Sequence, residues 1–329
     1  MDSGRYEIRP FAEPDYEAGA RLNSLWMPEF PETVEDARRW HDIIAKDPDR
    51  LMVRLVGEER GTGSVIAWGG LVHTLFNFHP HKYYVRVVVD PAHRRRGIGE
   101  EMYRRLEKIA MERHAICLWG NAREDDPSSL RFLEHHGYVA TRKTWSSRLR
   151  LTDLDLSKFP DRTKALMDSG IRFSTYAEEG ADRPDVQRRL YELGKITSED
   201  VPRLGEYAPV SFEEFMTIDL AGPNAIADAV FLACVGEKYV AWSTLQRLPG
   251  LPDTIDIGFT GTLPEFRGRG IASELKRRAV LYARAHGYRY LVTGNDSLNP
   301  RIWKINEKLG FTRQLVLVQS EKKLRPTDA

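Results

Sequence analysis

The stretch RRRGIG at residues 94–99 occurs a second time, as RGRGIA at residues 267–272. Each copy follows an apolar run and precedes an amphipathic helical pattern, and Gly97 and Gly270 lie 173 positions apart (270 − 97). A glycine-bearing turn between a strand and a helix directs free backbone N–H groups and the positive end of the helix at one point. This arrangement suits a phosphate group, so the sequence predicts two phosphate-binding turns.

The repeat extends beyond the two turns, which indicates a duplicated domain. Gly137 and Gly310, which close a later helix in each half, are again 173 positions apart (310 − 137). Asp126-Pro127 and Asn299-Pro300 open these two helices, with Asp or Asn as the N-cap and Pro as the first helical residue. Two equivalent halves of this length each provide enough chain for a core of their own.

Apolar periodicity predicts the same order of elements in both halves. In the first half we expect strand 83–89, helix 97–113, strand 115–119, helix 127–136 and one or two final strands within 140–151. In the second half we expect strand 254–262, helix 270–286, strand 289–293, helix 300–309 and strand 312–320. This order indicates an α/β (α+β) fold with a mixed, mostly antiparallel sheet flanked by helices in each half. The predicted organisation is an N-terminal domain at 1–155, a linker at 156–169 and a C-terminal domain at 170–329.

The composition limits the partners of the protein. Its net charge of +1 gives no support for broad binding to nucleic acids or to anionic membranes. The N-terminus has no apolar signal region, and no window approaches the roughly 18 apolar residues of a spanning helix. The two cysteines, Cys117 and Cys234, lie inside predicted strands, where we expect buried, reduced thiols. We predict a cytoplasmic protein without a metal site, as a monomer or homodimer.

Both copies resemble the GCN5-related N-acetyltransferase (GNAT) superfamily. The family pattern Arg/Gln-x-x-Gly-x-Gly/Ala is matched by both arginine-glycine stretches. Its later pattern, Asn followed by a helix and Leu-Gly-Phe, is matched by Asn295 with residues 309–311 and loosely by Asn121 with residues 136–138. The resemblance covers nearly the whole chain as two tandem units, a layout similar to mycothiol-synthase-like acetyltransferases.

This resemblance implies that each turn holds the pyrophosphate of acetyl-CoA (coenzyme A), and that the pantetheine arm lies along the preceding strand. The glycines let the ligand approach the backbone closely, and the arginines add positive charge near the phosphates. The cofactor-binding residues implied in this way are Val87, Val88, Val89, Arg94, Arg95, Arg96, Gly97, Ile98, Gly99, Glu100, Asn121, Thr260, Gly261, Thr262, Arg267, Gly268, Arg269, Gly270, Ile271, Ala272, Asn295, Asn299 and Asn306.

The resemblance further implies transfer to an amine of a small-molecule acceptor. Leu133 and Asn306 stand where many family members carry a Tyr that protonates the leaving thiolate. As general base we propose Asp256, at the start of the strand before the second turn, where the first half has Tyr83. The alternative is that this carboxylate is a cap or a surface ion-pair partner. On the basis of Asp256 we expect the C-terminal domain to be the catalytic one.

Three functions are compatible with the sequence. The first is an acetyl-CoA-dependent N-acetyltransferase that acts by direct transfer in a ternary complex. The second is a transferase on the same fold that uses another acyl or aminoacyl donor. The third is a non-catalytic tandem module that only binds acyl-CoA, which the missing Tyr favours. The two intact glycine turns favour an acyl-CoA ligand over aminoacyl-tRNA.

Overall fold

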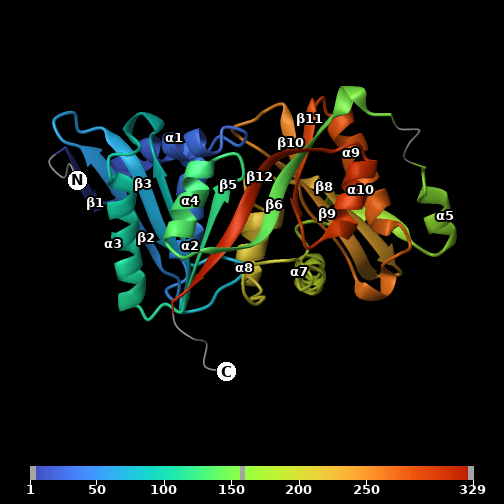
Figure 1. The fold of residues 1–329 in the computed structure, drawn as a ribbon. Helices are drawn as coiled ribbons and strands as arrows, with labels where there is room; N and C mark the ends of the chain where they lie inside the picture. Colours follow the sequence, from blue (N-terminus) through green and yellow to red (C-terminus); the bar gives the residue numbers. More distant parts are fainter. Residues whose placement is uncertain (1–4, 156–159, 325–329) are drawn as a thin grey trace. The chain divides into compact units, whose positions relative to one another are not determined.

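The computed structural model describes residues 5–155 and 160–324 (Figure 1). The chain divides into two compact units, and each combines segments that are distant in the sequence. Unit 1 contains the described residues 5–142, 204–208 and 317–324, and unit 2 contains residues 143–155, 160–203 and 209–316.

Unit 1 is built on a sheet in which β4 and β5 pair in parallel and all other neighbours pair in antiparallel. The strand order is β1 (Tyr6–Pro10), β2 (Met52–Glu59), β3 (Val65–Val72), β4 (Lys82–Val89), β5 (Cys117–Arg123) and the second half of β12 (Thr312–Lys323). The helices are the short η1 (Glu13–Asp15), α1 (Tyr16–Trp26), α2 (Val34–Ala45), the short η2 (Pro91–His93), α3 (Ile98–Glu112) and α4 (Pro127–His135).

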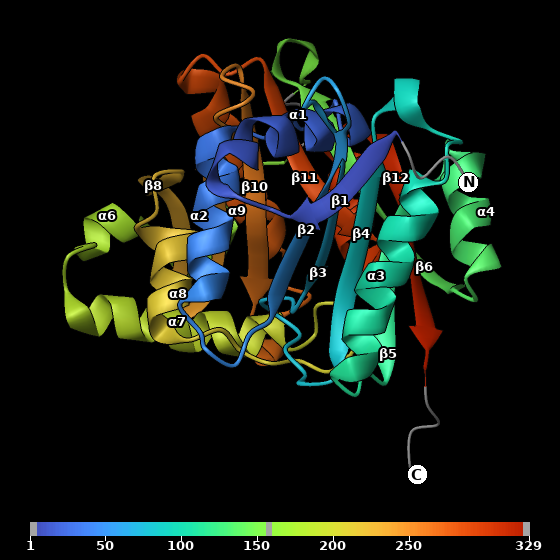
Figure 2. The ribbon, with the colours of Figure 1, turned by 90° about the vertical axis from the view of Figure 1, so that its left-hand side faces the viewer.

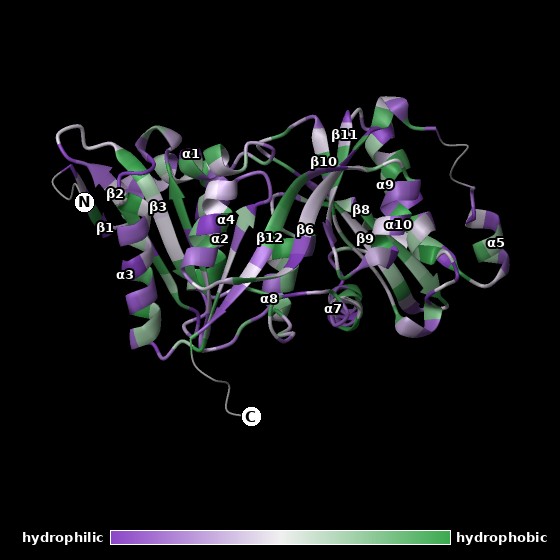
Figure 3. Cartoon of the chain, viewed as in Figure 1, coloured by the Kyte–Doolittle hydropathy of each residue, from purple (hydrophilic) through white to green (hydrophobic). Residues whose placement is uncertain are grey.

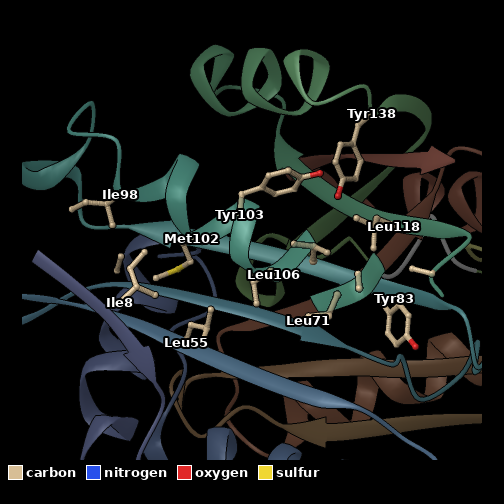
Figure 4. Packing of buried hydrophobic residues seen from close by; sticks show 14 of the residues in the cluster. Ile8, Leu55, Leu71, Tyr83, Ile98, Met102, Tyr103, Leu106, Leu118 and Tyr138 are labelled. Atoms are coloured by element: carbon tan, nitrogen blue, oxygen red, sulfur yellow. The ribbon is translucent and has the colours of Figure 1, made fainter. Parts of the chain in front are cut away.

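Helix α3 packs on one face of this sheet because its apolar residues recur every four positions. Ile98, Met102 and Leu106 are buried on that face, in a cluster that also contains Leu55 of β2 and Leu71 of β3 (Figure 4). Hydrophilic residues alternate with them along the helix (Figure 3), as expected for a helix with one buried face. Helices α1 and α2 lie on the opposite face of the sheet (Figures 1 and 2).

Unit 2 repeats this plan, with β10 and β11 as the parallel pair. The strand order is β6 (Val139–Arg150), β11 (Tyr290–Asp296), β10 (Thr254–Thr262), β9 (Lys238–Arg247), β8 (Ala225–Val235) and β7 (Arg172–Thr175). The helical segments are η3 (Leu151–Asp153), α5 (Thr163–Asp168), α6 (Tyr176–Glu179), α7 (Pro184–Ser198), α8 (Phe212–Phe215), the π-helix η5 (Met216–Leu220), η6 (Pro264–Phe266), α9 (Ile271–Ala285) and α10 (Pro300–Lys308).

The last strand of each sequence half pairs with a strand of the other sequence half. In unit 2, β6 lies antiparallel to β11, with Thr144–Arg150 opposite Tyr290–Asp296. In unit 1, β12 lies antiparallel to β5, with Leu317–Lys323 opposite Cys117–Arg123. Both strands are predicted as elements by the sequence, but their exchange of partners is a finding of the structure.

The predicted fold class is confirmed, because each unit has a mixed, mostly antiparallel sheet flanked by helices. The sequence boundary between the halves stays a prediction. Within the predicted linker, residues 156–159 lie outside the described residues, and Thr163–Asp168 form α5. In the part of the chain that the structure describes, no helix has both the length and the apolar character needed to span a bilayer.

Candidate active site

The two glycine turns have the same backbone conformation. Gly97 and Gly270 are the N-caps of α3 and α9, with φ of 86° and 87°. Two residues earlier, Arg95 and Gly268 also have positive φ, of 66° and 78°. A left-handed φ is disfavoured for a residue with a Cβ, so a glycine at the cap position is required by the turn itself.

The arginines of the two turns are also used in the same way. In unit 1, Arg94 donates from Nε to the carbonyl of Val89 at 3.2 Å. In unit 2, Arg267 donates from Nε to the carbonyl of Thr262 at 3.0 Å. These bonds hold each turn against the end of its strand. The first N–H groups of α3 and α9 have no acceptor within their helices, so they are available to an anion.

A cavity of about 500 Å³ lies between β4 and β5 of unit 1, and we call it the loop cavity. It forms because β4 and β5 pair only at residues 82–84 and 117–119 and then separate. Its wall includes the glycine turn and the first turn of α3, and it also includes Trp26 and Arg86. The structure places the following predicted cofactor residues on its wall: Val87, Val88, Val89, Arg94, Arg95, Gly97, Ile98, Gly99, Glu100 and Asn121. Arg96 instead lines a neighbouring cavity of about 430 Å³, together with Gly97 and Ile98.

Several polar atoms of residues on the wall of the loop cavity are buried without a hydrogen-bond partner among the described residues. They include Oδ1 of Asn121 on β5, Nε of Arg86 on β4 and the hydroxyl oxygen of Tyr138. Buried polar groups normally have partners, so these atoms indicate a place for a ligand or water. The sequence analysis missed Tyr138. Its signal was available, because the first copy has Tyr where the second has Phe311.

Glu100 faces a different set of partners. Burial alone would raise its pKa, but the hydrogen bond and charge of His136 and the nearby Arg104 hold the pKa below its ordinary value. The carboxylate lies 2.9 Å from Nε2 of His136 and 2.6 Å from Nε of Arg104. Its charge is therefore neutralised within the protein, which leaves its backbone N–H, in the first turn of α3, as the group that an anion would meet.

In unit 2, β10 and β11 pair at residues 254–257 and 290–293 and then separate in the same manner. The hydroxyls of Thr260 and Ser243 are 2.8 Å apart, and a Cβ on Gly261 would lie 2.6 Å from Cβ of Thr197. Arg267 pairs with Asp200 at 2.6 Å. These partners lie within unit 2. Beside the separated strands β10 and β11, more of the side chains therefore contact one another than in the loop cavity of unit 1.

A β-bulge interrupts β10 directly after Ile257, one residue beyond Asp256. Ile257 pairs with Leu245 of β9, but Phe259 pairs with the adjacent Thr244, so Gly258 is an extra, unpaired residue. A bulge bends its strand and changes the face on which the following side chains lie. The extra residue therefore shifts the correspondence between the two halves in this strand.

Asp256 corresponds to Tyr84, and the match to Tyr83 expected from the sequence was wrong. Asp256 pairs with Val292 of β11, whereas Tyr84 pairs with Trp119 of β5, and these partners are 173 positions apart (292 − 119). Tyr83 belongs to the core beneath α3, where its hydroxyl donates to the carbonyl of Pro80 (Figure 4). Tyr84 faces α1 and α2, so its counterpart Asp256 faces the α7 side of unit 2.

Burial raises the pKa of Asp256 to about 7, and the charge of Lys276 acts in the opposite direction. Lys276 on α9 is 1% exposed, and burial lowers its pKa to about 8. No ion pair joins the two side chains among the residues that the structure describes. Asp219, on the π-helix η5, is a second carboxyl whose pKa burial raises to about 7. A carboxyl with such a pKa can accept a proton near neutral pH.

The sequence-based match of Asn295 to Asn121 is wrong by one residue. The strands Cys117–Arg123 and Tyr290–Asp296 are offset by 173 at both ends (290 − 117 and 296 − 123), so the counterpart of Asn121 is Gly294. Because side chains alternate along a strand, Asn121 and Asn295 face opposite sides of their sheets.

The three asparagines of the second half that were predicted to bind the cofactor all have partners inside unit 2. Asn306 is fully buried and donates from Nδ2 to Oδ1 of Asn295 at 2.7 Å. Asn295 donates in turn to Oγ of Ser147 on the exchanged strand β6, at 2.8 Å. Asn299 caps α10 by accepting from the N–H of Ile302 at 3.4 Å. The contribution of these residues to cofactor binding stays a prediction. Their contribution to the fold is a set of hydrogen bonds and the cap of α10.

We expect Asn306→Ala to lower the free energy of unfolding by about 1–3 kcal/mol, because it leaves the buried Oδ1 of Asn295 without its donor. Chemical denaturation followed by tryptophan fluorescence measures this difference. Lys304→Ala, on the exposed side of the same helix, is the control and is expected to change stability by less than about 0.5 kcal/mol. Equal stability of both variants would contradict the structural contribution of Asn306.

Comparisons with known proteins agree with the two-unit arrangement. The model of the "Acetyltransferase (GNAT) family" matches residues 19–138 and again residues 195–311. A mycothiol acetyltransferase of Stackebrandtia nassauensis is 25% identical over 319 residues, which are 92% of this chain and 97% of that protein. A mycothiol acetyltransferase of Geodermatophilus obscurus is 27% identical over 242 residues, 70% of each chain.

Solved structures share the fold across the whole chain. A GCN5-related N-acetyltransferase from Sphaerobacter thermophilus has a TM-score of 0.72 at 21% identity, and the match covers 98% of this chain and 96% of that one. A tandem GNAT protein from the clavulanic acid biosynthesis pathway also has a TM-score of 0.72, at 19% identity, over 98% and 100% of the two chains. With the family model matched in both halves, the chain belongs to the acetyltransferase (GNAT) family and is an N-acetyltransferase with two GNAT units in tandem.

Proposed function

We propose that the protein transfers an acetyl group from acetyl-CoA to a primary amine of a small-molecule acceptor, by direct transfer in a ternary complex. The observation that carries this proposal is the loop cavity, which joins the glycine turn of unit 1 to the opened strands β4 and β5. A duplicated turn with the same conformation supports a second cofactor site in unit 2.

The residues of the loop cavity fit acetyl-CoA. The free N–H groups at the start of α3 suit its phosphates, and Arg94 and Arg95 add positive charge nearby. The separated edge of β4 suits the amide groups of a pantetheine arm, which can bond there as an added strand would. The unpartnered Oδ1 of Asn121 provides one further acceptor at the far end. When bound, acetyl-CoA would supply the acetyl group as an activated thioester.

In unit 2 we propose that Asp256 accepts the proton of the acceptor ammonium group. The acceptor nitrogen then forms the new C–N bond while the C–S bond of the thioester breaks, and the second proton that the nitrogen loses reaches the leaving thiolate through solvent. A carboxyl whose pKa is about 7 is suited to this step near neutral pH. Cys117 and Cys234 are buried, and burial raises the pKa of each thiol to about 11, which favours direct transfer over a cysteine acyl-enzyme.

The two other functions compatible with the sequence are less well supported. A purely binding module has no need for a carboxyl of raised pKa beside a β-bulge, where Asp256 lies. An aminoacyl-tRNA donor would call for a strongly basic surface, and the net charge of the chain is +1.

The test is release of free thiol from acetyl-CoA in the presence of a panel of primary amines. We expect at least one amine to give release that depends on enzyme and acceptor, with the N-acetylated amine as product by mass spectrometry. Alcohols of the same carbon skeleton are the control and are expected to give no product. Tight acetyl-CoA binding without turnover across the panel would favour the binding module, and no binding at all would favour another donor.

A further inference from the structure

A second cavity of unit 1, of about 350 Å³, lies on the α1 and α2 side of the sheet. We call it the aromatic cavity because Phe11, Tyr16, Trp40, Trp68 and Tyr84 line it. Arg86 of β4 belongs to the walls of both this cavity and the loop cavity. A ligand held by Arg86 therefore lies where the two cavities meet.

Arg86 carries a hydrogen-bond donor that the described part of the chain leaves unused. Its guanidinium lies over the ring of Trp26, 4.3 Å from the centroid, and its Nε is buried without a hydrogen-bond partner. Among the described residues it forms no ion pair within 4.0 Å. The planar donors of a guanidinium match the two oxygens of a carboxylate. The unpartnered Nε therefore leaves Arg86 able to bind the carboxylate of a ligand.

Glu32 provides the complementary charge in the same cavity. Asn23 donates from Nδ2 to Oε2 of Glu32 at 2.7 Å, which fixes the amide orientation and leaves Oδ1 of Asn23 buried and unpartnered. The main-chain N–H of Glu32 is held by Oγ of Ser24 at 3.0 Å, so the carboxylate is positioned by its own loop. Burial raises the pKa of Glu32, and the hydrogen bond of Asn23 and the charge of Arg86 partly oppose this. Glu32 and Asn23 therefore present two acceptors to a group that only donates.

We propose that unit 1 binds an aromatic α-amino acid as acetyl acceptor, with its carboxylate on Arg86, its ammonium group on Glu32 and Asn23, and its ring in the aromatic cavity. This inference rests on the proposed function, because the acetyl group would come from a cofactor in the adjoining loop cavity. The ligand is neutral overall, as is the Arg86–Glu32 pair that receives its two charges. Arg54, also on the cavity wall, lies over the rings of Phe11 and Tyr16, where it can face the ring of the ligand.

The reaction in unit 1 balances without a further reactant. The ammonium group loses one proton to Glu32, and the freed nitrogen forms the C–N bond as the C–S bond of the thioester breaks. The nitrogen then loses its second proton, which reaches the leaving thiolate through solvent, so the products are the N-acetyl amino acid and the free thiol.

Calorimetric titration of the full-length protein with L-phenylalanine tests the proposal, alongside L-phenylalaninamide, which lacks the carboxylate, and 3-phenylpropionate, which lacks the amine. Each analogue is expected to bind about ten to a hundred times more weakly, since each loses a charge-assisted contact. Arg86→Met is expected to remove the preference for L-phenylalanine over its amide, and Glu32→Gln the preference over 3-phenylpropionate. Arg148→Met is the matched control, because Arg148 also lies over an aromatic ring, 4.1 Å from the centroid of Tyr290, but in unit 2.

If Arg86→Met does not fold, Arg86→Lys keeps the charge and loses only the planar donors, and it is expected to weaken L-phenylalanine binding while the amide is unaffected. Absent binding of L-phenylalanine, or equal binding of all three compounds, would overturn the proposal. A separate titration with acetyl-CoA distinguishes failure of the acceptor proposal from failure of the proposed function. Cofactor binding without L-phenylalanine binding overturns only the acceptor class, whereas absence of cofactor binding overturns the proposed function.

Discussion

Gly97→Val is expected to abolish acetyl-CoA binding in unit 1, and Gly270→Val is expected to abolish it in unit 2. Each glycine has a φ near 87° at the cap of its helix, where valine is strongly disfavoured. The new side chain would turn the first N–H groups of the helix away from the phosphates, or would fill the space that the phosphates need. Calorimetric titration of the wild type is expected to show two sites, and each variant is expected to retain one.

Two other glycines provide matched controls for backbone strain. Gly61 in unit 1 and Gly287 in unit 2 also have positive φ, of 93° and 78°, and a Cβ at either position would meet nothing within 4 Å. Gly61→Val and Gly287→Val therefore introduce similar strain away from the proposed sites, and both sites are expected to remain. If Gly97→Val and Gly270→Val left the affinity unchanged at both sites, the assignment of the turns to the pyrophosphate would be wrong.

The two turns were predictable from the sequence because their geometry is local. A glycine before an amphipathic helix and after an apolar strand specifies the cap, the positive φ and the free N–H groups within six consecutive residues. The elements around each turn follow from periodicity in the same way. The arrangement of β4, α3, β5 and α4 in unit 1 thus agrees with the expected order of strands and helices.

The exchange of β6 and β12 could not be predicted in this way. Periodicity identifies a strand and its buried face, but the choice between two equivalent sheet edges depends on contacts across more than 140 residues, such as Asn295 with Ser147. Since the two halves are duplicates, their sheets offer equivalent edges to either last strand. The sequence therefore predicts the strands and leaves their partners open.

The one-residue errors at Asp256 and Asn121 have a related cause. A constant offset of 173 holds at the turns, but Gly258 adds a residue inside β10, and the tryptophans Trp68 and Trp242 of the preceding strands differ by 174 (242 − 68). In a strand, a shift of one residue moves a side chain to the other face. The aromatic cavity was missed for a different reason, because Glu32 and Arg86 come together only through tertiary packing.

Asp256→Asn is expected to lower kcat about a hundredfold to ten-thousandfold if unit 2 is catalytic and Asp256 is its base. Acetyl-CoA affinity is expected to stay unchanged, because Asp256 lies in the part of β10 that is still paired with β11, outside the separated edge and the turn. The wild-type rate is expected to rise with pH through about 7, as the carboxyl loses its proton. This rise is expected to be absent in Asp256→Asn. Asp253→Asn is the matched control, because this carboxyl is 43% exposed and only three residues away.

Stability provides an independent check on the same carboxyl. A folded-state pKa of about 7, above the ordinary 3.8, means that its contribution to stability is present at low pH and is lost as pH rises through about 7. Asparagine does not ionise, so the melting temperature of Asp256→Asn relative to wild type is expected to increase between about pH 4 and pH 8. A constant difference over this range would contradict the raised pKa.

The rival to Asp256 is Asp219, whose pKa is raised to the same value on the π-helix η5. The carbonyl of its neighbour Ile218 accepts from Nε2 of Gln246, and Gln246 is the β9 partner of Asp256, so both carboxyls belong to one region of unit 2. If Asp256 is the base, the rate of Asp219→Asn is still expected to rise with pH through about 7. If Asp219→Asn lost the rise of the rate with pH and Asp256→Asn kept normal kinetics, Asp219 on the π-helix would be the proton acceptor instead.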